Sequence, residues 1–217
     1  MTLVNVPLQC STRPLSAKVQ TILREASARE QQFTSNRPLG FRGFVPSCHE
    51  TVFRALEIIE QDALAPGTSF CEWGSGLGVA TLLAGVLGFD AYGIEIDRGL
   101  LDAAREMAGQ FEIAAEFVHG SYVPSGADLL IDKAYARCSG ELSLVTEADD
   151  AYETLGMDIR DFDLVFNYPW PNDEYLTAAL FDKFASDGAL LLTYLGLENV
   201  RLRRKETSPH PARRRHK

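Results

Sequence analysis

The feature that most constrains this chain is a glycine-rich stretch at residues 71–78, which reads Cys-Glu-Trp-Gly-Ser-Gly-Leu-Gly. It closes an apolar run at 68–73 and leads into a second apolar run at 77–87 with the composition of a helix. Glycine has no Cβ and accepts positive φ, so such a loop brings backbone close to a ligand at the start of the next helix. The stretch therefore predicts a strand, a ligand-binding loop and a helix.

An acidic side chain beside these glycines narrows the kind of ligand. Glu72 ends the predicted strand, and its fixed negative charge would repel a pyrophosphate and favour a cationic nucleoside. A dinucleotide site of the form G-x-G-x-x-G is one alternative, but its third small residue would fall at Val79. Glycines that only make a tight turn are the other alternative, and both remain open at this point.

Strand and helix patterns alternate along most of the chain. Strands are predicted at 68–73, 91–96, 115–119, 162–167 and 189–194, and helices at 16–32, 47–62, 77–87, 98–108 and 173–186. Such alternation predicts βαβ units and a parallel sheet between helical layers. In sheets of this kind ligands bind beyond the carboxyl ends of the strands, so the residues that follow each strand are the site candidates.

Two motifs together carry a resemblance to a known family. Residues 72–78 read Glu-x-Gly-x-Gly-x-Gly, and residues 93–97 read Gly-Ile-Glu-Ile-Asp, with Glu95 lying 21 residues beyond Gly74. Over about residues 47–194 the chain resembles the class I (seven-strand, Rossmann-like) S-adenosylmethionine-dependent methyltransferases. The resemblance implies a three-layer, mostly parallel α/β sheet. Little chain follows the fifth predicted strand, so we expect a truncated sheet of six strands or fewer, with 199–205 as an edge strand and an N-terminal helical extension.

The resemblance also implies the cofactor, S-adenosyl-L-methionine, and the residues that hold it. Glu72 and the glycine loop would hold the methionine end, and Glu95 would accept hydrogen bonds from the ribose. Ile96 with Ser121 or Tyr122 would surround the adenine, although Ser121 stands where the family commonly has an acid. The predicted cofactor-binding residues are Glu72, Trp73, Gly74, Gly76, Gly78, Glu95, Ile96, Ser121 and Tyr122.

A third motif, after the fourth predicted strand, points to the chemistry. Asn167, Tyr168, Pro169 and Trp170 resemble the Asn-Pro-Pro-aromatic motif of methyltransferases that act on amide or exocyclic amino nitrogens, with Tyr168 in place of a proline. In that motif the asparagine oxygen and a backbone carbonyl orient an NH₂ group while the aromatic ring stacks on the substrate, which is catalysis by positioning. We predict that these four residues face the acceptor. The alternative is a proline-rich turn in which Trp170 covers the core.

Methyl transfer is the predicted activity, and two other functions remain open. One is cofactor binding without turnover, in an interaction module that acts through a basic tail. The other is a different transfer on the same fold, such as aminopropyl transfer, for which an acid would be expected where Asn167 stands.

The chain is divided into three parts by its composition. Residues 1–46 are predicted to form a helix and an aromatic loop that pack on the core, 47–200 the methyltransferase domain with an insertion at about 121–161, and 201–217 a basic, disordered tail. The tail holds eight Lys or Arg and one acid, whereas the other 200 residues hold 13 basic and 29 acidic side chains. The tail either folds back on this acidic body or contacts a polyanion such as RNA.

The expected partners follow from the acidic body. A large nucleic-acid footprint needs phosphate contacts, so the methyl acceptor is expected to be a small molecule or a protein side chain, with nucleic acid reached only by the tail. Scattered cysteines without a C-x-x-C pair, and the lack of a signal segment or membrane-length apolar run, predict a cytoplasmic protein without a metal site or membrane partner. The oligomeric state is left without a prediction.

Three features near residue 45 complete the predictions. Ser47 and Glu50 have the spacing of a capping box at the start of the helix predicted over 47–62. Cys48 and His49 are adjacent on that helix and point apart, so we assign them a structural role rather than that of a nucleophile pair. The aromatic loop at 41–44 either covers the cofactor or pins the N-terminal helix.

Overall fold

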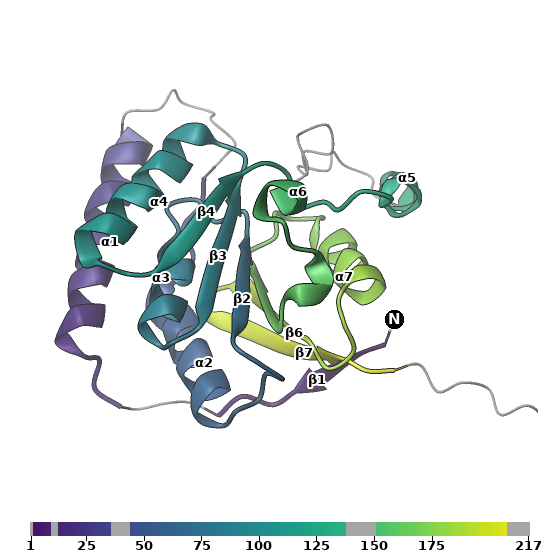
Figure 1. The fold of residues 1–217 in the computed structure, drawn as a ribbon, viewed down its shortest axis with the longest axis horizontal. Helices are drawn as coiled ribbons and strands as arrows, with labels where there is room; N and C mark the ends of the chain where they lie inside the picture. The colour runs from purple at the N-terminus through teal and green to yellow at the C-terminus, as the bar shows by residue number, and fades with distance from the viewer. Residues whose placement is uncertain (1, 10–12, 36–43, 138–150, 208–217) are drawn as a thin grey trace, which may run out of the picture.

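The chain is organised around a seven-stranded sheet with the strand order β1-β7-β6-β5-β2-β3-β4 (Figure 1). The computed structural model describes residues 2–9, 13–35, 44–137 and 151–207. Strands β2 to β6 run parallel, while β7 is antiparallel to both of its neighbours, β6 and β1. The strand bounds are β1 (Leu3–Val6), β2 (Ser69–Trp73), β3 (Asp90–Glu95), β4 (Ala115–His119), β5 (Leu164–Asn167), β6 (Leu190–Gly196) and β7 (Asn199–Lys205).

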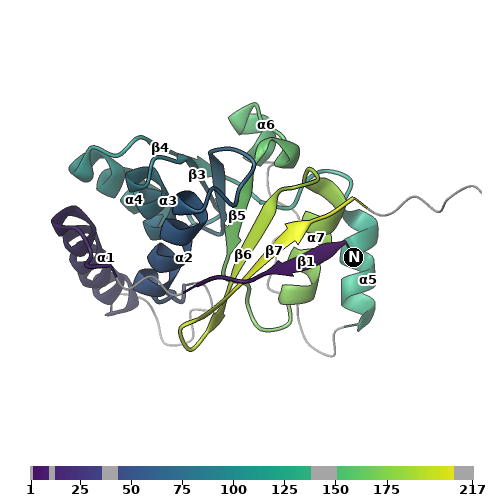
Figure 2. The same ribbon diagram turned by 90° about the horizontal axis from the view of Figure 1, so that it is seen from below.

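Helices cover both faces of this sheet, as the two perpendicular views agree (Figures 1 and 2). One face carries α1 (Ala17–Ser35), α2 (His49–Gln61), α3 (Val79–Val86) and α4 (Arg98–Phe111). The other carries α5 (Asp128–Arg137), α6 (Ala151–Leu155), a 3₁₀ turn (Ile159–Asp161) and α7 (Glu174–Phe184). The predicted three-layer, mostly parallel α/β fold is therefore confirmed. Within the described ranges, no helix is long and apolar enough to cross a membrane.

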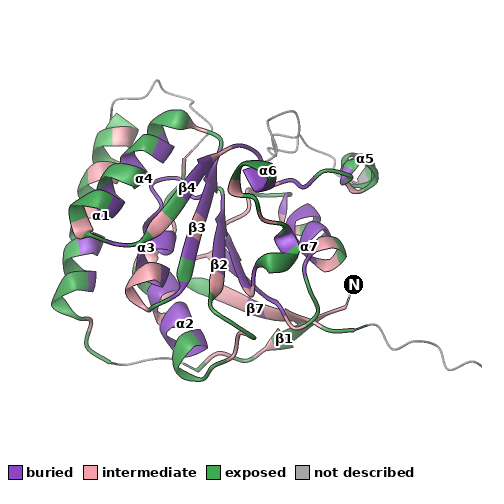
Figure 3. Cartoon of the chain, in the orientation of Figure 1, coloured by how far each residue is buried: buried purple, intermediate pink, exposed green. Residues whose placement is uncertain are grey.

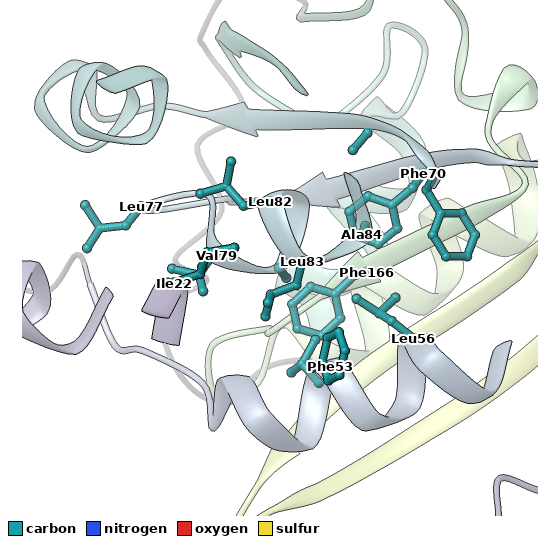
Figure 4. Close-up of a cluster of buried hydrophobic side chains, with 14 of the residues drawn as sticks. Ile22, Phe53, Leu56, Phe70, Leu77, Val79, Leu82, Leu83, Ala84 and Phe166 are labelled. Atoms are coloured by element: carbon teal, nitrogen blue, oxygen red, sulfur yellow. The ribbon is translucent and has the colours of Figure 1, made fainter. Parts of the chain in front are cut away.

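Strand alternation gives the sheet two separate cores. Along β2, Phe70 packs into the core under α1 to α4, whereas Cys71 packs into the core under α5 to α7. Figure 4 shows the first core, where Phe53 of α2 points toward Phe166 of β5. The central strands are buried from both sides (Figure 3), which explains why their sequences read as continuous apolar runs.

The N-terminal strand β1 corrects the predicted strand number. We expected six strands or fewer and assigned residues 1–46 to a helix and a loop, and both expectations are wrong at residues 3–6. These residues pair with β7, with Val4 opposite Arg204, and thereby add the seventh strand at the sheet edge. Thr2 reinforces this position, because its backbone N–H and its hydroxyl donate to Asp182 Oδ1 over 2.7 and 2.6 Å. The strand number was predicted from the short chain that follows the fifth predicted strand. The seventh strand comes from the N-terminal end of the chain instead, so that argument could not reveal it.

The first part of the predicted tail belongs to the sheet. Residues 199–205 form the strand predicted there, so the prediction of a disordered tail from residue 201 is wrong for residues 201–205. The side chains of these residues alternate between the two faces of the sheet. Arg201 Nη1 lies 2.6 Å from Glu174 Oε1, and Arg204 Nη2 donates to the carbonyl of Leu64 over 2.8 Å. Residues 208–217 lie outside the described residues.

Two local predictions have mixed outcomes. The capping box at the start of α2 is wrong, because the helix begins at His49 with Cys48 as its N-cap and no side-chain cap. The Ser47 hydroxyl instead lies 3.3 Å from His49 Nδ1. The insertion at 121–161 contains α5, α6 and the 3₁₀ turn. Its residues 138–150 lie outside the described residues.

Candidate functional site

A pocket of about 500 Å³ lies beyond the carboxyl ends of the central strands. Four parts of the chain build it: the glycine loop after β2, the end of β3, the loop between β5 and α7 with the end of β6, and an N-terminal wall. The wall comprises Glu30 of α1, residues 44–47 and His49 of α2. This is the edge at which ligands of parallel sheets bind, and the volume lies within the range of small-molecule sites.

The glycine loop passes close to the sheet in a left-handed conformation. Gly74, Gly76 and Gly78 have φ values of 71°, 54° and 69°. The N–H groups of Gly74 and Ser75 donate to the carbonyl of Ile94 over 3.0 and 2.9 Å, which ties the loop to β3. Gly74, Ser75 and Gly76 all line the pocket.

Two of these glycines are also required by close packing. A Cβ on Gly76 would stand 2.8 Å from Cε2 of Phe44, so only glycine leaves room for that ring on the loop. A Cβ on Gly78 would stand 2.4 Å from Cε1 of Phe117. Gly78 does not line the pocket; as the N-cap of α3 it leaves room for the Phe117 ring of β4.

Glu72 is buried at the pocket wall and faces the start of α3. Its Oε2 accepts hydrogen bonds from the backbone N–H and the hydroxyl of Thr81, over 2.8 and 2.6 Å. Burial raises the pKa of Glu72 to about 8, against the lowering effect of the two Thr81 hydrogen bonds. A cationic ligand in the pocket would favour the ionised carboxylate, since opposite charges attract strongly where water is scarce.

Glu95 joins the end of β3 to the glycine loop. Its Oε1 accepts from the N–H groups of Ile96 and Asp97, both at 2.8 Å, and its Oε2 accepts from the N–H of Gly76 at 2.7 Å. Burial raises the pKa of Glu95, while these hydrogen bonds act in the opposite direction. A carboxylate has about four lone-pair sites, so the group that lines the pocket retains capacity to accept from a ligand hydroxyl.

The other predicted cofactor residues are not part of the pocket lining. Trp73 points to the opposite face of the sheet from Glu72, where its ring stacks on Tyr122 with centroids 5.1 Å apart. Ser121 is buried and its hydroxyl accepts from the N–H of Val123 over 3.1 Å. Ile96 is 38% exposed beside Glu95. The structure therefore brings Glu72, Gly74, Gly76 and Glu95 together and places the predicted adenine neighbours outside this pocket.

The motif at 167–170, which begins at the end of β5, divides between the two faces of the sheet. Tyr168, Pro169 and Trp170 line the pocket, and the Tyr168 ring meets Tyr194 edge-on with centroids 4.8 Å apart. Asn167 does not line it. Its side chain is buried, and its Nδ2 donates to the carbonyl of Trp73 over 2.9 Å. Successive side chains of a strand point to opposite faces of the sheet. Asn167, the last residue of β5, therefore points to the face opposite Phe166, which is the face of its cross-strand partner Trp73.

The N-terminal wall was missed by the sequence analysis. His49 was assigned a structural role, yet it lines the pocket and its Nε2 forms a hydrogen bond with the Glu30 carboxylate. Glu30 gives no local signal, because it reaches the pocket only through the docking of α1. Phe44 lies over Gly76 in the pocket, as expected if the aromatic loop covers the ligand; the rest of that loop, 41–43, lies outside the described residues.

The described part of the pocket lining carries acidic side chains that no lysine or arginine in it balances. Four carboxyl side chains line the pocket, and the described lining residues include no Lys or Arg: the four are Glu30, Glu72, Glu95 and Glu174. Aromatic side chains stand between them, namely Phe44, Phe166, Tyr168, Trp170 and Tyr194. Carboxyl groups and aromatic rings in one pocket favour a positively charged ligand and disfavour a phosphate.

Comparisons with known proteins identify the fold. No protein-family model and no curated protein matches the chain. Among solved structures, an RNA methyltransferase from Salinibacter ruber in complex with S-adenosyl-L-homocysteine is 18% identical, with a TM-score of 0.51, and the match covers 77% of this chain and 97% of that one. A methyltransferase from Geobacter sulfurreducens is 16% identical, with a TM-score of 0.51 and coverage of 89% and 93%. The chain therefore has the fold of the class I S-adenosylmethionine-dependent methyltransferases.

Proposed function

We propose that this protein is a methyltransferase that uses S-adenosyl-L-methionine bound over the glycine loop. The observation that carries the proposal is the joining of Glu95 to Gly76 at the wall of a pocket that Glu72 also lines. A glycine loop between two buried acids suits a nucleoside with hydroxyls at one end and positive charge at the other.

The residues present fit this ligand. Glu95 would accept hydrogen bonds from the ribose hydroxyls, while Glu72 would face the cationic methionine end and Gly74 and Gly76 would allow close backbone approach. The bound molecule supplies a methyl group on a positively charged sulfur. For the adenine we retain Ile96, Ser121 and Tyr122 as proposed neighbours, and Trp73 and Gly78 as residues that support the loop from outside the pocket.

For the acceptor we propose a nitrogen held by the loop that follows β5. Tyr168, Pro169 and Trp170 would contact it, since all three line the pocket. Asn167 would act as a positioning residue, because its hydrogen bond to the Trp73 carbonyl fixes the point at which this loop leaves the sheet. Transfer would then depend on alignment of the acceptor with the methyl group.

Calorimetric titration tests the proposal. We expect S-adenosylmethionine and S-adenosylhomocysteine to bind the wild-type protein. Glu95→Ala should weaken both by about tenfold or more, because hydrogen bonds to a charged group contribute about 1.5–3 kcal/mol. Glu116→Ala, on the exposed side of β4, is the matched control and should bind like wild type. Absence of binding by the wild-type protein would refute the proposal, whereas binding without methylation of any of a broad panel of acceptors would favour an interaction module.

A further inference from the structure

We propose that the Glu30–His49 pair on the N-terminal wall binds a protonated primary amine and removes its proton, so that the methyl acceptor of this protein is an amine. This inference rests on the proposed function and deepens it, because it names the acceptor class and two further residues of the same site. Among the remaining lining residues, no other ionisable pair is left unassigned to the cofactor or to the fold.

The geometry makes Nδ1 the proton-accepting nitrogen of His49, and the hydroxyl of Ser47 is its neighbour. Glu30 and His49 come from different helices, and their side chains are only 14% and 15% exposed. A carboxylate can only accept, so the hydrogen bond at Nε2 places the ring proton on that nitrogen. In the neutral ring Nδ1 then carries a lone pair. Nδ1 lies 3.3 Å from the hydroxyl of Ser47, which also lines the pocket.

Among the residues that the structure describes, the two arginines nearest to the pair in the sequence contact other carboxyl groups. Arg29, next to Glu30, is directed instead to Glu25 and Glu106, at 2.8 and 3.3 Å. Arg54, on the same helix as His49, contacts Glu50 and Glu57. With a neutral imidazole, the pair therefore presents one negative charge at the wall.

The other carboxyl groups of the pocket already have partners. Glu174 is paired with Arg201, Glu72 is bonded to Thr81, and Glu95 to backbone N–H groups. An incoming ammonium group would thus find its counter-charge at Glu30.

An amine fits this wall better than the other acceptor classes. An ammonium ion is attracted by Glu30 and by aromatic rings such as those of Tyr168 and Trp170, which line the same pocket. A nucleotide would bring phosphate charge to a pocket whose described lining includes four carboxyl groups and no Lys or Arg. A neutral hydroxyl would gain little from the charge of the pair. Charge and proton-accepting capacity together select the protonated amine.

The proposed step balances in protons and electrons. The ammonium group donates a proton to His49 Nδ1, which leaves a neutral amine with a free lone pair. That lone pair forms the new nitrogen–carbon bond as the carbon–sulfur bond breaks, and the sulfur keeps the bonding electrons and becomes neutral. The product is a methylated ammonium ion, and the imidazolium returns its proton to water. His49 is therefore a catalytic residue, and Glu30 positions the ring from its Nε2 side and supplies the negative charge that attracts the ammonium.

The test uses the full chain saturated with S-adenosylhomocysteine and a defined probe, n-butylammonium, with n-butanol as its neutral match. Probe binding is followed by NMR, together with the ¹⁵N signals of the His49 ring. We expect n-butylammonium to bind in preference to n-butanol. Glu30→Gln should weaken the ammonium probe about fivefold or more while leaving n-butanol unchanged, as expected for loss of a partly buried charge pair. Glu25→Gln, on the same helix outside the pocket, is the matched control.

Each result decides the inference. A ring protonated at Nε2, with an Nδ1 signal that shifts on addition of n-butylammonium, supports the role of His49, and a ring protonated at Nδ1 instead overturns it. Equal binding of the two probes, or equal ammonium binding by wild type and Glu30→Gln, also overturns the inference while leaving the proposed function intact. If S-adenosylhomocysteine itself fails to bind, the proposed function falls, and the inference falls with it. Unfolding curves of each variant confirm that it is folded.

Discussion

At the scale of single residues, Glu72 couples the site to the stability of the fold. Its carboxyl group is buried beside Thr81, and burial raises its pKa from 4.5 to about 8. A protein without ligand holds this group protonated at neutral pH, whereas a cationic ligand favours its ionised form. The ionised Glu72 carboxylate thus destabilises the folded protein when the pocket is empty, and it has a partner of opposite charge when a cationic ligand is bound.

This predicts a specific pH dependence for unfolding without ligand. Between pH 4.5 and 8 the folded chain holds a proton on Glu72 that the unfolded chain has lost, so the free energy of unfolding falls as pH rises through this window. Glu72→Gln should remove this contribution. Its free energy of unfolding, relative to that of the wild type, should therefore rise by about 2–4 kcal/mol between pH 5 and pH 8. Urea unfolding at several pH values measures it.

The comparison of this variant with wild type centres on Glu72. Glu95, whose pKa is also raised by burial, is present in both proteins, so the comparison reports Glu72 together with the effect of the Glu95 charge on it. Glu116→Gln, on the exposed side of β4, should follow the wild-type curve. If the Glu72→Gln and wild-type curves stay parallel from pH 5 to pH 8, Glu72 does not hold the proton.

Gly78 provides a second test at this scale. It belongs to the glycine motif, yet a Cβ there would overlap Phe117. Gly78→Ala should therefore destabilise the fold by about 2–4 kcal/mol, from strained backbone and overpacking together. Gly88 also has positive φ, at 94°, but has nothing within 4 Å of an added Cβ. Gly88→Ala should cost only the backbone part, about 1 kcal/mol, and equal losses for the two variants would show that the packing contact is absent.

At the scale of elements, β1 is the piece that completes the sheet. It pairs with the outer edge of β7, whose other edge is formed by β6. Without β1, β7 would present unpaired backbone groups, which is a recognised route to association between chains. The first strand in the sequence therefore protects the last strand of the sheet.

Deletion of residues 2–6 tests this role. We expect a lower urea midpoint, faster hydrogen exchange at those amides of residues 202–206 that face β1, and a tendency to associate that size-exclusion chromatography detects. Thr2→Ala removes only the hydroxyl bond to Asp182 and should cost about 1 kcal/mol without association. A deletion variant with wild-type stability and wild-type exchange would contradict the pairing.

The elements also show how far the sequence could predict this fold. Strand β4 matches its predicted bounds and β2 and β3 differ by a residue at their ends, because apolar runs and the glycine motif mark them locally. β1 has only four residues, of mixed exposure, and its partner lies about two hundred positions away. No local pattern in Leu3–Val6 distinguishes it from an extended terminus, so its pairing is decided by tertiary structure.

At the scale of the whole molecule, the pocket is closed by parts that the sequence keeps far apart. The acids at the strand ends could be predicted, since strand periodicity and glycine spacing locate Glu72 and Glu95. The N-terminal wall could not, since Glu30 meets His49 only after α1 and α2 have packed on the sheet. Asn167 shows the converse difficulty, because its motif predicts a contact while strand alternation directs it to the other face.

The most direct measurement is hydrogen–deuterium exchange with and without S-adenosylhomocysteine. The binding site proposed above predicts slower exchange at residues 74–79 and 95–97 when the ligand is present, and weaker protection in Glu95→Ala at the same ligand concentration. Binding elsewhere, with unchanged exchange in the glycine loop and after β3, would contradict a cofactor site over Gly74 and Gly76.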